Sequence, residues 1–148
     1  MNRFLRHPAT NAVGISGFSL FYGILFLALS QRVESQTGMA TNALWRTWDA
    51  FLNVGGHRYL AVLLLGLTAL VVILLLTKHK PYDEYHTAIL VKCLAIACVL
   101  TLAAIAAFFM VILFDSTQII SKFALFAILN WATVVLADLI YLLLCGRK

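Results

Sequence analysis

Hydrophobic residues fill four long, nearly unbroken runs along the chain, and short polar segments separate them. The runs cover roughly residues 9–30, 59–77, 88–114 and 123–145. Each is close to the roughly 20 apolar residues that a helix needs to cross a hydrocarbon core of about 30 Å. None alternates between apolar and polar residues as a barrel strand does. The pattern therefore predicts four transmembrane helices.

We expect an all-α integral membrane bundle that forms one transmembrane domain over residues 1–148. Pro81 can start the third helix, because its missing N–H costs nothing at that position. The basic start of the chain also resembles a cleavable signal, but an apolar run of about 21 residues is longer than the usual 7–15. The expected spanning helices cover about 9–30, 59–77, 81–114 and 117–145, and a short surface helix covers about 42–54.

The stretch TNALWRTWDAFLNVGG, which lies between the first two spans, predicts that surface helix. Thr41 or Asn42 can cap its start, and the pair Gly55–Gly56 can end it. Its apolar and polar side chains separate onto two faces, and tryptophan is typical of membrane interfaces. We expect an exterior interfacial helix that is either an anchor or a lid and partner surface, with the residues Trp45, Arg46, Trp48 and Phe51.

Composition and charge fit a protein whose solvent is lipid. The chain is 63% hydrophobic and 11% charged, whereas soluble domains are about half apolar and about 25% charged. Short, dense basic segments lie on the side of the N-terminus, the middle loop and the C-terminus: Arg3, Arg6, Lys78, Lys80, Arg147 and Lys148. The opposite side holds Arg32, Arg46, Arg58 and Lys122 over a longer length. This asymmetry predicts a multi-pass protein of the plasma or inner membrane with both termini cytoplasmic.

One acidic residue, Asp138, lies inside the fourth apolar run. Asn130 and Asp138 are eight residues apart and share one helix face with Tyr141 nearby. Polar groups in spanning helices usually face the bundle interior and are functional-site candidates. We therefore expect this stripe to form a proton or ion site, or an interhelical polar contact.

The depth of each residue in its helix suggests partners for Asp138. Counting 1.5 Å per residue from each helix centre places Ser16 level with Asp138 and Ser19 one turn further out. These serines are the expected partners, and an ion pair with Lys92 is the alternative. Hydroxyl partners would favour a neutral or proton-exchanging acid, whereas Lys92 would keep the carboxylate charged and structural.

The remaining chemistry points away from an enzyme. The chain has no CxxC pair, no glycine-rich phosphate loop and no triad arrangement. No histidine lies mid-membrane, and the spacing of His79, Asp83 and His86 matches no strong metal motif, so we expect neither cofactor nor metal. No basic stripe lies on a soluble face, so nucleic acid is not an expected partner.

Two classes of function remain. Small residues at Ala12, Ser16, Ser19 and Gly23 favour close helix packing. The first class is a small non-enzymatic accessory or assembly subunit, whose partners are the bilayer and either itself or a larger membrane protein. The alternative is an oligomeric proton- or cation-coupled transporter of small molecules that uses Asp138.

Overall fold

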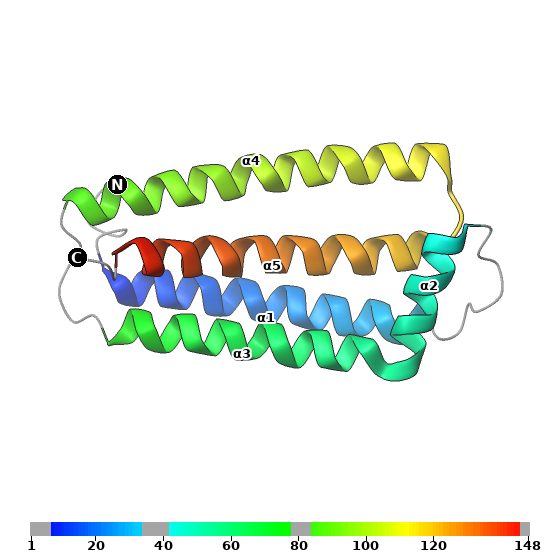
Figure 1. Ribbon diagram of the computed structural model, residues 1–148, viewed down its shortest axis with the longest axis horizontal. Coiled ribbons are helices and arrows are strands. Elements are labelled where there is room, and N and C mark those ends of the chain that lie inside the picture. The colour runs from blue at the N-terminus through cyan, green and yellow to red at the C-terminus, as the bar shows by residue number, and fades with distance from the viewer. Residues whose placement is uncertain (1–6, 34–41, 78–83, 146–148) are drawn as a thin grey trace.

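The computed structural model describes residues 7–33, 42–77 and 84–145, and every regular element in those ranges is a helix. Four long helices lie side by side, and a short one crosses one end of the bundle (Figure 1). Four helical stretches are long and apolar enough to cross a membrane, the second being the short helix and the span that follows it. The chain is therefore an all-helical, multi-pass membrane protein. The elements are α1 (Pro8–Val33), α2 (Ala43–Phe51), η2 (Leu52–Gly56), α3 (His57–Leu76), α4 (Glu84–Phe114) and α5 (Ile119–Cys145).

Several helix boundaries differ from the expected ones for local reasons. Helix α5 begins at residue 119 rather than 117, because Gln118 has a φ of 54°, a left-handed conformation that helices exclude. Asn42 caps α2 by accepting a hydrogen bond from the Leu44 N–H at 3.3 Å. The expected start of the third span at Pro81 lies outside the described residues, as do Thr41, the histidine and aspartate at 79 and 83, and the basic segments at both termini and in the middle loop.

The two glycines after α2 end its regular helical path, as the sequence suggested. They lie in η2, a single wide turn in which Gly55 leaves the helical conformation before α3 begins. Gly55 has a φ of 92°, which only glycine adopts readily. A Cβ on Gly56 would lie 2.5 Å from the Phe51 carbonyl oxygen, so a side chain has no room there. The pair therefore turns the chain between α2 and α3.

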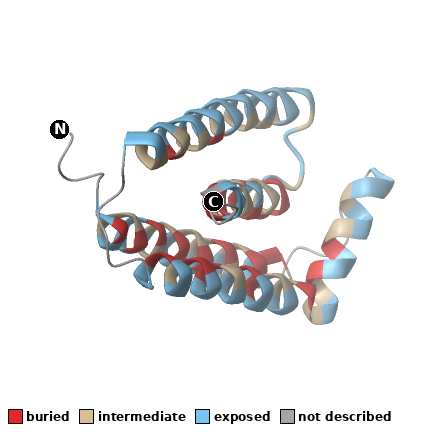
Figure 2. Ribbon diagram, turned by 60° about the vertical axis from the view of Figure 1, so that its left-hand side comes forward, coloured by how far each residue is buried: buried red, intermediate tan, exposed pale blue. Residues whose placement is uncertain are grey.

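Helices α1, α3 and α5 form the core of the bundle. Their buried faces turn toward one another (Figure 2). Trp131 of α5 is fully buried, and a Cβ on Gly23 of α1 would lie 3.1 Å from its ring. Ala12 and Ser19 are buried on the same face of α1. The small residues of α1 thus pack inside the molecule, against α3 and α5.

Helix α4 is much less enclosed. Leu90 and Ala97 are its buried residues, and most of its packing is against α5 (Figure 2). Leu90 joins a buried apolar cluster at one end of the bundle. At the other end, the centre of the Phe108 ring lies 4.6 Å from that of Phe123 and 4.7 Å from that of Phe126. The helix is therefore attached near both ends, with Ala97 between these contacts.

Candidate functional site

Asp138 lies inside the bundle and is hydrogen-bonded to α1. Its side chain is 2% exposed, and the Asn11 amide donates to its Oδ1 at 3.1 Å. The two residues are 127 positions apart. The acid of the fourth span is thereby tied to the first turn of the first span, which joins α1 to α5 by a polar contact in an otherwise apolar region.

The partners expected for Asp138 are wrong. Ser19 faces α3 instead, where its hydroxyl lies 3.1 Å from that of Thr68. Ser16 is half-buried on α1, and Lys92 is exposed on α4. Depth along the membrane was a poor guide here, because the rotation of each helix about its axis decides which neighbour a side chain meets.

Asn130 and Tyr141 share the interior face of α5 with Asp138, and all three are buried. The Asn130 amide donates to the Phe126 carbonyl of its own helix at 2.9 Å, while its Oδ1 is buried without a hydrogen-bond partner. Tyr141 is fully buried in an apolar cluster with Ala12 and Ile15 of α1. The stripe therefore contains the predicted residues, but they do not converge on one centre.

A second polar cluster, which the sequence did not predict, lies at the α4–α5 turn. Lys122, expected as an exterior charge, is 1% exposed, and its Nζ lies 3.1 Å from Asp115 Oδ2. It also donates to the Thr117 carbonyl at 2.7 Å and to the Asp115 carbonyl. These contacts satisfy the hydrogen-bonding needs of the buried ammonium. In the sequence, the spacing of seven residues between Asp115 and Lys122 is the feature from which this ion pair could have been predicted.

Asp115 caps that turn and is held as a carboxylate. The Thr117 hydroxyl and N–H donate to its Oδ1 at 2.6 and 2.9 Å. These two hydrogen bonds, together with the hydrogen bond and the charge of Lys122, lower the pKa of Asp115 to about 2. The turn is therefore tied together by charge at neutral pH.

Helix α2 is docked onto this turn. The Trp48 indole donates to the Ser121 carbonyl at 3.2 Å, and the Gln118 amide donates to Asp49 Oδ2 at 2.8 Å. The Lys122 ammonium lies 5.4 Å from the centre of the Trp45 ring. Asp49, a charged residue of this amphipathic helix, is buried at 8% exposure.

The other residues proposed for the α2 surface lie further from these contacts. Arg46 is exposed, and Phe51 stacks on Trp48 with ring centres 5.8 Å apart. The polar side of α2, rather than its tryptophans alone, thus joins it to α5. This docking was hidden in the sequence because the contacts come from residues about 70 positions away.

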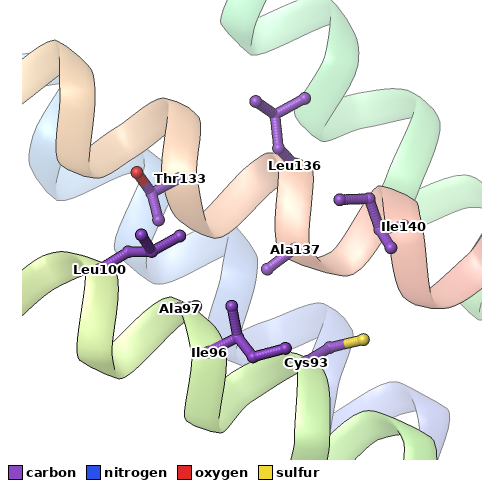
Figure 3. A pocket seen from close by; sticks show the side chains of 8 residues that line it. All are labelled: Cys93, Ile96, Ala97, Leu100, Thr133, Leu136, Ala137 and Ile140. Carbon is purple, nitrogen blue, oxygen red and sulfur yellow. The ribbon is translucent and has the colours of Figure 1, made fainter.

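Two apolar pockets lie along the α4–α5 contact, and Asp138 lines neither of them. The larger has a volume of about 250 Å³ and is shown in Figure 3. Its lining residues come from α4 and α5 alone: Cys93, Ile96, Ala97, Leu100, Thr133, Leu136, Ala137 and Ile140. The smaller, of about 150 Å³, lies nearer the α4–α5 turn and includes Trp45 of α2. Neither pocket brings together the ionisable groups that catalysis needs.

Comparison with known proteins assigns no family to this arrangement. No protein-family model matches the chain, and no curated protein or solved structure matches it either. Within the described residues, no three histidine, cysteine or acidic side chains gather as metal ligands would.

Proposed function

We propose that this chain is a small non-enzymatic membrane subunit that assembles with a larger membrane protein or with copies of itself. The supporting observation is the outward face of α4. Ala88, Ala95 and Ala106 are exposed and lie on the side of α4 opposite the buried Ala97. Small residues are typical of faces where transmembrane helices approach closely. A transmembrane helix of another subunit can pack against this face, because α4 is the helix that this chain encloses least.

The polar residues of the other spans support the same proposal. Asn11 and Asp138 join α1 to α5, and Ser19 and Thr68 join α1 to α3. Such contacts stabilise a bundle by roughly 0.5–2 kcal/mol each. In this role Asp138 is an interhelical contact, and the bundle is a rigid support that presents α4.

The test is native mass spectrometry of the protein extracted gently from its membrane. We expect a stoichiometric complex, either with a larger protein or between copies. The double variant Ala95→Leu/Ala106→Leu should dissociate it. The matched control is Ala28→Leu/Ala69→Leu, which places the same bulk at exposed alanines of α1 and α3. A solitary wild-type chain, or equal behaviour of the two double variants, would overturn the proposal.

We further propose that the protein lies in the plasma or inner membrane with both termini cytoplasmic. The described ends of α1 and α5 lie at the same end of the bundle (Figure 1), as an even number of spans requires. The short, dense basic segments at the two ends of the chain and in its middle loop favour the cytoplasmic side. In a cysteine-free background, Ser116→Cys should react with an impermeant maleimide on intact cells, and Thr77→Cys only after permeabilisation.

A second candidate function is the oligomeric proton- or cation-coupled transporter. The observation in its favour is Asp138, a carboxyl group that is 2% exposed and bound to an amide. Asp138→Asn keeps the shape and a hydrogen-bonding group but cannot carry a proton. Proton flux into proteoliposomes that disappears with Asp138→Asn would support transport, and flux equal to that of empty liposomes would exclude it.

A further inference from the structure

The larger pocket between α4 and α5 is a partly open groove, and Figure 3 shows the side chains that line it. Ala97, which is 6% exposed, and the half-buried Ala137 form its floor. Larger aliphatic side chains form its rims, and about half of each is exposed: Ile96 62%, Leu100 53%, Leu136 46% and Ile140 50%. The groove exists because two alanines face each other between longer side chains.

The side chains that line the groove favour a hydrocarbon ligand. Seven of the eight lining residues carry no side-chain oxygen or nitrogen, and the eighth is Thr133. The Thr133 hydroxyl donates to the Leu129 carbonyl of its own helix at 2.8 Å. A volume of about 250 Å³ is below the roughly 300–1,000 Å³ of pockets that hold drug-sized molecules. A narrow apolar chain fits this space better than a polar solute.

The length of the groove favours a lipid acyl chain over a transmembrane helix as its occupant. From Cys93 to Leu100 it extends about 10 Å along α4 at 1.5 Å per residue, which is less than one leaflet of about 15 Å. Toward the α4–α5 turn, the contacts of Phe108 with Phe123 and Phe126 hold the two helices together. A transmembrane partner helix would need a continuous face across the bilayer, whereas an acyl chain needs only one leaflet.

A basic residue stands at the end of the groove that lies nearest the membrane surface. Lys92 is exposed, precedes Cys93 and lies one helical turn before Ile96. It is about 13 Å from Thr101, near the centre of α4, and so lies close to the hydrocarbon boundary. Helical side chains lean toward the N-terminus, so the ammonium reaches the headgroup layer. Its charge is complementary to a lipid phosphate.

We propose that this groove binds one acyl chain of an anionic phospholipid whose headgroup is held by Lys92. The inference does not rest on the proposed function, because the groove faces α5 and the exposed alanines of α4 face the opposite way. It also holds for either orientation of the chain, since Lys92 and the groove occupy the same leaflet.

The experiment is native mass spectrometry of purified, delipidated protein with equal amounts of phosphatidylglycerol and phosphatidylcholine that carry the same acyl chains. We expect one retained lipid, with phosphatidylglycerol favoured about fivefold, as a single basic residue near an anionic headgroup implies. Lys92→Gln should lower this preference to about one while lipid remains bound, and Lys92→Arg should keep it. Arg58→Gln, at an exposed site on α3, is the charge control.

Filling the groove tests its floor. Ala137→Leu should remove the retained lipid, and Ala69→Leu, at an exposed alanine of α3, should not. Thr133→Leu fills the groove from its other end. It replaces Ala137→Leu as the test variant if Ala137→Leu lowers helicity in circular dichroism. Equal lipid retention by wild type and by a folded groove variant would overturn the site. An unchanged headgroup preference in Lys92→Gln would overturn the role of Lys92, and crosslinking of Ile96→Cys between copies would show that protein occupies the groove.

Discussion

Helix α4 and the core helices α1, α3 and α5 are all apolar enough to cross a membrane, but they are held in different ways. The core helices meet through close contacts such as Gly23 on Trp131 and through hydrogen bonds between side chains. Helix α4 meets its neighbours through apolar groups at its two ends, around Leu90 and Phe108. In lipid, apolar contacts alone specify a partner weakly, because lipid tails offer nearly the same environment.

This difference shows which helices are held in one arrangement and which helix can change its neighbours. Small residues and buried polar pairs set the register of the core, so one arrangement is favoured over others. The apolar surface of α4 is compatible with α5, with lipid and with another protein. A subunit that must recognise a partner can use such a helix without loss of its own fold.

The largest effect should come from breaking the core. Gly23→Leu places a side chain against Trp131, where even a Cβ would lie 3.1 Å from the ring. We expect a loss of unfolding free energy of about 3 kcal/mol or more, measured by thermal unfolding in mild detergent. Gly66→Leu is the control, since nothing lies within 4 Å of a Cβ there. Equal melting temperatures for the two variants would contradict the packing of α1 on α5.

A matched change in α4 should act locally. Leu90 is 1% exposed, and Leu90→Ala should cost on the order of 2 kcal/mol at that contact. We expect the distribution of distances between spin labels on α4 and α3 to broaden, while the distribution for a label pair on α1 and α5 stays the same. Simultaneous broadening of both pairs would show that α4 is as firmly integrated as the core.

The contact between Asn11 and Asp138 should have a moderate effect. Asn11→Ala and Asp138→Val each remove the hydrogen bond, so each should lower stability by roughly 1 kcal/mol. Asp138→Asn should stay closer to wild type, because an amide can still bond to Asn11. The double variant Asn11→Ala/Asp138→Val should cost less than the sum of the single changes. Strict additivity would mean that the pair is not coupled.

The pair of hydroxyls between α1 and α3 should contribute less. Ser19 and Thr68 lie 3.1 Å apart, and Thr68 also donates to the Leu64 carbonyl at 2.8 Å. We expect Ser19→Ala to cost about 0.6 kcal/mol, the average for such bonds in membranes. The control is Val13→Ala, at an exposed position of the same helix. Stabilisation by Ser19→Ala would contradict the contact.

The last prediction concerns the pH dependence of the turn that joins α4 to α5. The pKa of Asp115 falls from 3.8 to about 2 on folding, so its carboxylate favours the folded state above pH 4. This contribution is lost as the pH falls toward about 2. The melting temperature of Asp115→Asn should therefore lie below that of wild type at pH 6 and approach it near pH 2. A constant difference across this range would show that the charge of Asp115 is not involved.

Hydropathy was sufficient to predict the four spans and the capped helix before the second one. It could not supply the partner of Asp138, because depth along the membrane does not define how each helix is rotated. Ser19 matched the depth criterion but is turned toward Thr68. The burial of Lys122 could not be predicted either, because its compensating groups, Asp115 and two carbonyls, are assembled only when the turn folds. Helical periodicity places residues on faces, and tertiary packing decides what each face meets.

The bond between Asn11 and Asp138 also has a consequence for biosynthesis. It joins residues 127 positions apart, in the first and the last of the four spans. Ribosomes add roughly 5–20 residues per second, so the first span waits several seconds for the helix that completes its packing. During that interval the amide of Asn11 and the small-residue face of α1 at Gly23 face lipid or the insertion machinery. Assembly of this bundle is therefore completed only after the last span has been released into the membrane.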